Sequence, residues 1–253
     1  MKEEILKLYN QGISGTKLAK MFNKDASTIY KYIRQAGGTV KSYSEASQKY
    51  SLDKTYFSVI NTEEKAYWLG FIYADGCITQ GKLSIGLSSV DKNHLVKLKK
   101  CLGYNGPLHS YKSNTNKNKT NVSLQISNKT LLLDLKTQGV YPCKTYTCNF
   151  PNITNSLYKH FIRGYFDGDG SVGFEKGVFS GISICGNKEF LNSLRDILIK
   201  ELDITNTKLI YSRNIYVYSK RGKIQATKIL KWLYLNNNIS LNRKQTLISP
   251  LIE

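Results

Sequence analysis

Two aspartates, Asp75 and Asp169, occupy the same place in two copies of one motif. The stretch AYWLGFIYADGCI (66–78) aligns without a gap with HFIRGYFDGDGSV (160–172). Each acid ends an apolar run at helical spacing, where a carboxylate meets the negative end of the helix dipole. Two such acids side by side would also repel each other. A divalent cation would relieve both effects. Hard oxygen ligands favour Mg²⁺, which beside a phosphodiester could activate water and stabilise the leaving oxygen.

The same residues also have a purely structural interpretation. Ala-Asp-Gly and Gly-Asp-Gly are ordinary helix-stop sequences, with Gly76 and Gly170 as left-handed caps. For a single copy this interpretation would be preferred. Two gapless copies in a chain of net charge +19 favour the metal site instead.

Small residues recur at helical spacing in both copies. The stripes are Ala66, Gly70 and Ala74 in the first copy and His160, Gly164 and Gly168 in the second. Glycine inside a helix costs about 1 kcal/mol relative to alanine. The glycines at 70 and 164 therefore predict that the two helices pack closely through these stripes. That packing would bring the two aspartates together.

The motif opens a longer repeat that predicts the fold. Each copy is followed by a strand-like run, an amphipathic helix, a polar loop with further strands and a closing helix. The strand-like runs are LSIGLSS (83–89), NVSLQIS (121–127), FSGISIC (179–185) and NIYVYS (214–219). The expected fold is α+β, with the order α-β-β-α-β-β-α at 61–150 and again at 151–253.

Residues 1–36 are predicted to form a separate helical unit. Three short segments with helical spacing, and a tight turn between the second and third, make a helix-turn-helix pattern. This stretch resembles the helix-turn-helix of resolvases and transposases. The side chains on or near the recognition helix would be Ser27, Thr28, Tyr30, Lys31 and Arg34. A small helical cap on a larger domain is the alternative, and residues 37–60 are expected to be a linker.

The composition limits the possible partners. The net charge of +19 points to a polyanion, with nucleic acid first and an anionic membrane surface second. No apolar stretch is long enough to span a bilayer, and the N-terminus lacks a signal peptide's apolar core. The five cysteines form no CxxC pair. We therefore expect an intracellular protein. Its location would be the cytoplasm or nucleoid of a bacterial or phage-infected host, or an organelle. Neither a membrane nor a small-molecule substrate is expected as a partner.

The stretches WLGFIYADG and IRGYFDGDG resemble the two signature helices of LAGLIDADG homing endonucleases. The matched pairs are Gly70 with Gly164, Ala74 with Gly168, Asp75 with Asp169, and Gly76 with Gly170. Tyr73 departs from the pattern, which usually has its first acid there; the second copy keeps this acid as Asp167. In the family the essential ligand is the last acid, so the departure leaves Asp75 intact. NFPNI and LNRKQTL further resemble the intein-type branch.

The resemblance covers about residues 57–253 and implies a single-chain, pseudo-twofold nuclease. Each unit would lay a curved antiparallel sheet in the DNA major groove. Asp75 and Asp169, with their neighbours Ala74 and Gly168, would share Mg²⁺ ions, for which Mn²⁺ can substitute. The implied partner is double-stranded DNA with a long asymmetric site, cut on both strands to leave 3′ overhangs. The enzyme would belong to a mobile element or phage. It would act as a monomer, because the second unit replaces a dimer partner.

Members of the family often add a basic residue near each active site. By position after the last strand, Lys220 is the better candidate and Lys129 the weaker, while Gln125 could hold a catalytic water. DNA-reading candidates are polar and basic side chains on alternate strand positions, and the loop at 110–121. They are Lys82, Ser84, Ser88, Lys112 and Ser123 in the first unit, and Lys176, Ser180, Ser183, Arg213 and Tyr216 in the second.

Two other functions fit the sequence. A DNA-binding regulator on this fold could have lost cleavage. Such proteins also pair the fold with a helix-turn-helix, but they characteristically lack one or both metal aspartates, and both are present here. An RNA-binding intron maturase is the third interpretation that the sequence allows.

Overall fold

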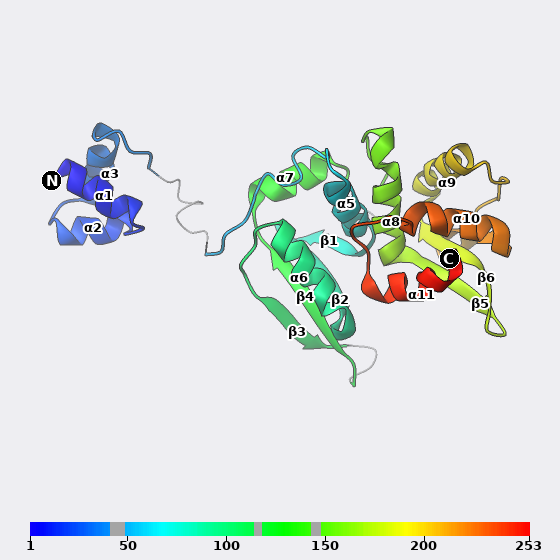
Figure 1. The fold of residues 1–253 in the computed structure, drawn as a ribbon. Coiled ribbons are helices and arrows are strands. Elements are labelled where there is room, and N and C mark those ends of the chain that lie inside the picture. Colours follow the sequence, from blue (N-terminus) through cyan, green and yellow to red (C-terminus); the bar gives the residue numbers. More distant parts are fainter. Residues whose placement is uncertain (41–48, 114–117, 143–147) are drawn as a thin grey trace. The chain divides into compact units, whose positions relative to one another are not determined.

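The computed structural model describes residues 1–40, 49–113, 118–142 and 148–253 (Figure 1). These residues divide into two compact units, Met1–Ser51 and Leu52–Glu253. Part of the polar loop expected at 110–121 lies outside the described residues. Within them, no helix is both long enough and apolar enough to cross a membrane.

The first unit is a three-helix cluster of α1 (Lys2–Asn10), α2 (Gly15–Met21) and α3 (Ala26–Gln35). Ser14 caps α2, because its side chain accepts the amide of Lys17 at 3.3 Å. The buried side chains of this unit form a core of their own. They are Ile5, Tyr9, Leu18, Ile29 and Ile33. The three helices expected at 1–36 are therefore present.

The second unit contains the expected element order twice. The first repeat comprises α5 (Glu63–Asp75), β1 (Gly76–Thr79), β2 (Lys82–Ser88), α6 (Lys92–Cys101), β3 (Leu108–Lys112), β4 (Thr120–Ile126) and α7 (Lys129–Thr137). The second comprises α8 (Tyr158–Asp169), β5 (Gly170–Glu175), β6 (Val178–Gly186), α9 (Lys188–Leu202), β7 (Ile210–Ser212), β8 (Ile215–Arg221) and α10 (Lys223–Tyr234). A further helix, α11 (Asn242–Ile252), was not predicted.

Each repeat builds one antiparallel sheet, in the orders β1-β2-β4-β3 and β5-β6-β8-β7. Side chains alternate between the two faces of a strand. The face that carries the buried residues, such as Leu83 and Ile85 of β2 or Ile184 of β6, is here called the inner face. The opposite face is the outer face. Ser180 is an extra residue on β6 at a β-bulge beside Gly173.

Residues 52–60, expected to be linker, lie within the second unit. Tyr56, Phe57 and Ile60 are buried in its core. The hydroxyl of Tyr56 donates to Glu64 Oε1 at 2.7 Å, which ties this segment to the first turn of α5. The boundary between the two units therefore falls near Ser51 rather than at residue 60.

His94 on α6 is expected to make stability depend on pH. The imidazole is 3% exposed and packs against Trp68 and Phe71, at 4.8 and 4.7 Å between ring centroids. Burial lowers the pKa of His94 from 6.5 to about 3, so the folded state holds the ring neutral. The unfolded chain binds a proton below its ordinary pKa. The His94 contribution should therefore cut the free energy of unfolding by about 1.4 kcal/mol per pH unit on descending from about pH 6 towards pH 3.

Urea unfolding of the native chain and of His94→Gln at pH 7 and pH 5 measures this contribution. The native chain should lose more stability than the variant over this interval. Equal losses in the two proteins would contradict the assignment of a buried, neutral His94.

Candidate active site

Helices α5 and α8 lie side by side (Figure 1). Their backbones touch at one glycine from each helix. A Cβ atom on Gly70 would lie 2.0 Å from the carbonyl oxygen of Phe161. One on Gly164 would lie 2.0 Å from the carbonyl oxygen of Tyr67. Phe161 and Tyr67 hold the same motif position, so the two contacts are equivalent. The structure thus places both glycines at the helix crossing, with the two repeats related by a pseudo-twofold axis.

Each helix ends at its acid and passes directly into a strand. Gly76 opens β1 with φ −76°, and Gly170 opens β5 with φ −89°. Each glycine does follow the last residue of its helix, but neither is left-handed, so the predicted left-handed caps are wrong. Glycine is needed for space, because a Cβ at either position would lie 2.6 Å from a carbonyl oxygen, that of Ile72 or Phe166.

The two acids meet at this end of the paired helices. A Cβ on Gly168 would lie 3.2 Å from Asp75 Oδ2 and 2.3 Å from the Cβ of Ala74. Asp75 therefore lies against the last turn of α8, and Asp169 is the residue after Gly168. Asp75 is half-buried and Asp169 is exposed. Both carboxylates thus belong to one place on the surface.

Lys244 of α11 reaches the same place, and the sequence analysis missed it. Its Nζ donates to the carbonyl oxygen of Phe166 and, at 2.5 Å, to that of Gly170. Burial lowers the pKa of Lys244 to about 8, and Asp167, Asp75 and Asp169 nearby oppose this shift. The amine therefore counters the negative charge at the end of α8. The run LNRKQTL (241–247), which contains Lys244, was the sequence feature that could have identified it.

Asp167, the first acid of the second motif, is a buried structural group. Its Oδ2 accepts the Tyr67 hydroxyl at 2.6 Å and the Leu241 amide at 2.7 Å, and its Oδ1 accepts the Tyr234 hydroxyl at 2.5 Å. Burial raises the pKa of Asp167, and these three hydrogen bonds oppose the rise. Leu241 is the residue before α11. Asp167 therefore fixes the start of the helix that carries Lys244.

Tyr73, at the equivalent position of the first motif, is also structural. Its side chain is 2% exposed, and its hydroxyl donates to the carbonyl oxygen of Gln138 at 2.6 Å. Its ring meets Phe161 edge-on, with centroids 5.1 Å apart. The departure from the family pattern thus changes core packing and leaves Asp75 in place.

The donor set at the acids suits a hard cation. Among the described residues there is no group of three or more histidine, cysteine or acidic side chains that could hold a metal ion. Lys244 occupies the carbonyl oxygens of Phe166 and Gly170. Mg²⁺ is commonly bound by one or two carboxylates together with water and phosphate oxygens. Asp75 and Asp169 fit that kind of binding better than a closed protein site.

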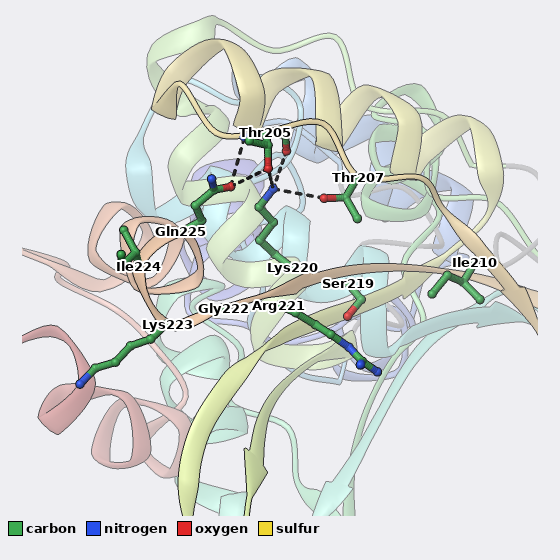
Figure 2. Close-up of a pocket in the computed structure, with 10 residues that line it drawn as sticks. All are labelled: Thr205, Thr207, Ile210, Ser219, Lys220, Arg221, Gly222, Lys223, Ile224 and Gln225. Carbon is green, nitrogen blue, oxygen red and sulfur yellow. Dashed lines mark hydrogen bonds between the residues drawn. The ribbon is translucent and has the colours of Figure 1, made fainter.

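Lys220 lies on the inner face of the second sheet. Its Nζ donates to Thr205 Oγ1 at 2.8 Å, to Thr207 Oγ1 at 3.1 Å and to the carbonyl oxygen of Thr205. Figure 2 shows this cluster, with Arg221 and Lys223 pointing away from it. Lys220 is only 3% exposed, and three acceptors hold its ammonium group. Lys220 thus lies on the inner face, whereas Asp169 leads into the row of Cys185 on the outer face, and this position argues against the predicted catalytic role of Lys220.

The two remaining catalytic candidates differ in position. Lys129 is exposed at the first position of α7 and borders a hollow with Thr79, at the end of β1 remote from Asp75. Gln125 lies on the outer face, in a row with Cys77 and Ser84 across three strands. Only Gln125 shares a sheet face and a neighbouring row with the acid.

Most DNA-reading candidates of the first sheet lie on its outer face. They are Lys82, Ser84, Ser88 and Ser123, which alternate with inner-face residues of β2 and β4, although Ser123 is itself only 5% exposed. Lys112 is an exception. Ser110, two positions before it on the same strand, pairs with the buried Val122. Lys112 therefore has the inner-face register, contrary to the prediction. The outer-face residues of β3 are His109, which was not predicted, and Tyr111, which falls in the contact loop expected at 110–121.

The second sheet shows the same division. Ser183 lies on the outer face and Ser180 at the bulge, while Lys176 and Arg213 are exposed in hairpin turns with φ of 50° and 51°. Tyr216 packs against the core on the inner face, contrary to the prediction. Three further outer-face residues were not predicted, namely Ser171, Ser219 and Arg221.

In the first unit, Ser27, Lys31 and Arg34 are exposed on α3, and Thr28 is half-buried. Tyr30 has a packing role, because a Cβ on Gly15 would lie 2.3 Å from its ring. Tyr30 therefore holds α3 against α2, while the exposed side chains remain available for contact.

Comparison with known proteins gives two findings. Residues 62–138 and 156–232 each match the family described as LAGLIDADG-like domain. Among curated protein sequences none matches this chain significantly.

Solved structures that are similar to this chain include DUF199/WhiA and two nucleases. Full-length DUF199/WhiA from Thermatoga maritima is 18% identical, with a TM-score of 0.50, over 79% of this chain; this chain spans 64% of that structure. I-DmoI in complex with DNA and Ca is 16% identical, with a TM-score of 0.49, over 78% of this chain and 99% of that one. Meganuclease I-AabMI bound to uncleaved DNA is 16% identical, with a TM-score of 0.47, over 73% and 87%.

At 18% identity the likeness to DUF199/WhiA shows the fold alone. The family match is independent of it and covers more than half of the sequence. Its two stretches also coincide with the two helix-and-sheet repeats. The chain therefore belongs to the LAGLIDADG family.

Proposed function

We propose that this chain is a site-specific endonuclease that hydrolyses both strands of double-stranded DNA with the help of a divalent cation. The observation that carries the proposal is the meeting of Asp75 and Asp169 at the ends of α5 and α8. Each acid leads into the first strand of a sheet whose outer face carries polar side chains. The net charge of +19 suits a polyanionic substrate.

The residues around the acids support this chemistry. When bound, the cation would make a coordinated water more acidic and stabilise the leaving oxygen. Asp75 and Asp169 provide the carboxylates that hold it, one from each repeat. Lys244 offers positive charge beside the phosphate that would be cut, and its position is fixed by the carbonyl oxygens of Phe166 and Gly170. Gln125 can hydrogen-bond a water from the outer face. Because a single chain supplies both acids, a monomer suffices to cut both strands of a long asymmetric site.

A DNA-binding regulator on the same fold is the rival function, and it would require neither acid. Selection of duplexes from a randomised pool with the native chain gives the substrate for a test. We expect these duplexes to be cut in Mg²⁺ or Mn²⁺, leaving 3′ overhangs, and to stay intact in EDTA. Tight, sequence-specific binding with no product in either metal would support the regulator and overturn the nuclease.

We further propose that the first unit binds DNA through α3, in addition to the two sheets. Lys31→Ala combined with Arg34→Ala should weaken DNA binding about tenfold at fixed salt. The slope of log K against log [salt] should fall by about 2, because two phosphates are no longer neutralised. The matched control is Lys17→Ala with Lys20→Ala on α2, which should change both quantities less. Equal effects of the two double variants would contradict a recognition role for α3.

A further inference from the structure

The outer faces of the two sheets differ in chemistry next to the acids. In the first sheet the row nearest Asp75 is Gly86, Ser123 and His109, which are in register across three strands. In the second sheet the equivalent row is Cys185, Val217 and Ile210. In the first row Gly86 has no side chain and Ser123 is only 5% exposed, so the hydrogen-bonding group it offers is the exposed His109; the second row offers only apolar surface and a thiol.

The apolar row is not part of the core. Ile184 and Tyr218, the neighbours of Cys185 and Val217 along their strands, are 0% exposed on the inner face. Alternation therefore directs Cys185, Val217 and Ile210 to the outer face. Ile210 is 57% exposed, and Cys185 and Val217 are half-buried. The row thus presents apolar groups where a soluble monomer would normally carry polar ones.

The row begins beside the acid of the second repeat. Gly170 pairs with Ile184, so Asp169 lies next to Cys185. Asp169 helps to raise the pKa of the Cys185 thiol, after the larger effect of burial, which agrees with this proximity. When a DNA phosphate lies at Asp169, the neighbouring bases would therefore lie along this row.

The residues around the row favour nucleic acid as its occupant. The next row on the same face is Ser171, Ser183 and Ser219, with 2.7 Å between the Oγ atoms of Ser171 and Ser183. Arg221 lies one row further, paired with Gly181, and is exposed. A second copy of a chain with charge +19 would be repelled from this surface. A DNA duplex would be attracted to it.

We propose that Cys185, Val217 and Ile210 read thymine by contact with its C5-methyl group in the major groove. That methyl is the apolar group that distinguishes a base pair in this groove. The proposal rests on the proposed function, because it needs DNA on the outer face. The DNA half-site bound by the second sheet should therefore contain at least one thymine that is recognised through its methyl group rather than through hydrogen bonds.

The test uses the full-length chain and duplexes selected from a randomised pool, with Ca²⁺ in place of Mg²⁺ so that binding is measured without cleavage. Each thymine in turn is replaced by deoxyuridine, which lacks only the methyl. At one or more positions in one half of the site the native chain should lose about fourfold in affinity, the value of one buried methyl. In Val217→Ala, Val217→Thr and Ile210→Ala this difference between thymine and uracil should shrink or disappear.

Ser219→Ala is the matched control on the neighbouring row, and it should keep the full difference. A difference of unchanged size in the Val217 and Ile210 variants would overturn the proposal, as would the absence of any thymine whose methyl matters. Those outcomes leave specific DNA binding and cleavage intact. Failure to select any preferred duplex would overturn the proposed function together with this inference.

Discussion

Replacing Gly164 by alanine is expected to destabilise the second unit by at least about 3 kcal/mol, although the same change inside an ordinary helix stabilises it by about 1 kcal/mol. The sign reverses because the new Cβ would lie 2.0 Å from the Tyr67 carbonyl oxygen, and backbone cannot move as a side-chain tip can. Gly70→Ala should cost a similar amount, because its contact with Phe161 is equivalent.

Thermal unfolding followed by tryptophan fluorescence measures this loss, since Trp68 and Trp232 both lie in the second unit. A 3 kcal/mol loss in a unit of this size corresponds to a fall of roughly 6–12 °C in Tm. Gly86→Ala is the control, because its Cβ would come closest to the hydroxyl of Tyr111, the tip of a flexible side chain. If the helix glycine variants melted at or above the native temperature, the account of the helix crossing would be wrong.

Replacing Lys244 by methionine is expected to reduce the rate of DNA cleavage about 100-fold or more, with DNA affinity within a few-fold of native. Methionine fills nearly the same volume without the charge. Removal of one fixed electrostatic group at a reacting centre commonly costs 10²–10³ in rate. Single-turnover cleavage of a selected duplex, with binding measured in Ca²⁺, separates the two quantities.

Lys220→Met is the informative comparison for Lys244→Met. Lys220 is equally buried but bonds Thr205 and Thr207 on the inner face. Its loss should lower stability by about 1–3 kcal/mol, because buried acceptors are left unpaired, and leave the cleavage rate within about threefold. A large loss of cleavage rate in Lys220→Met, with Lys244→Met nearly native, would instead support the sequence-based prediction that Lys220 is the catalytic lysine.

The fold was predictable because its signals are local and repeated. The motif helices, the four strand-like runs and the small-residue stripes each appear in the sequence at a fixed spacing. Because the repeat shows each feature twice, the matching positions of residues such as Gly70 and Gly164 are not a coincidence. Helix α11 escaped prediction because it falls after the second copy of the repeat has ended.

The candidate site was only partly predictable. Asp75 and Asp169 are fixed by the motif itself, whereas a lysine's role depends on which face of the sheet it occupies. Lys220 sits on a strand that pairs with the bulged strand β6, and it faces inward. Lys244 reaches the acids from α11, whose start Asp167 holds through a hydrogen bond between residues 74 positions apart. Such long-range hydrogen bonds leave no periodic signal in a single sequence.

The most direct test of the central claim is cleavage of a supercoiled plasmid carrying a selected site by Asp75→Asn and Asp169→Asn variants in Mg²⁺. Asp203→Asn serves as the matched control, because it removes the same charge from an exposed residue with φ 46°, a conformation that asparagine tolerates. The account predicts that the native chain and Asp203→Asn give linear product, while each active-site variant binds the site and gives none. Linear product at the native rate from either active-site variant would contradict it.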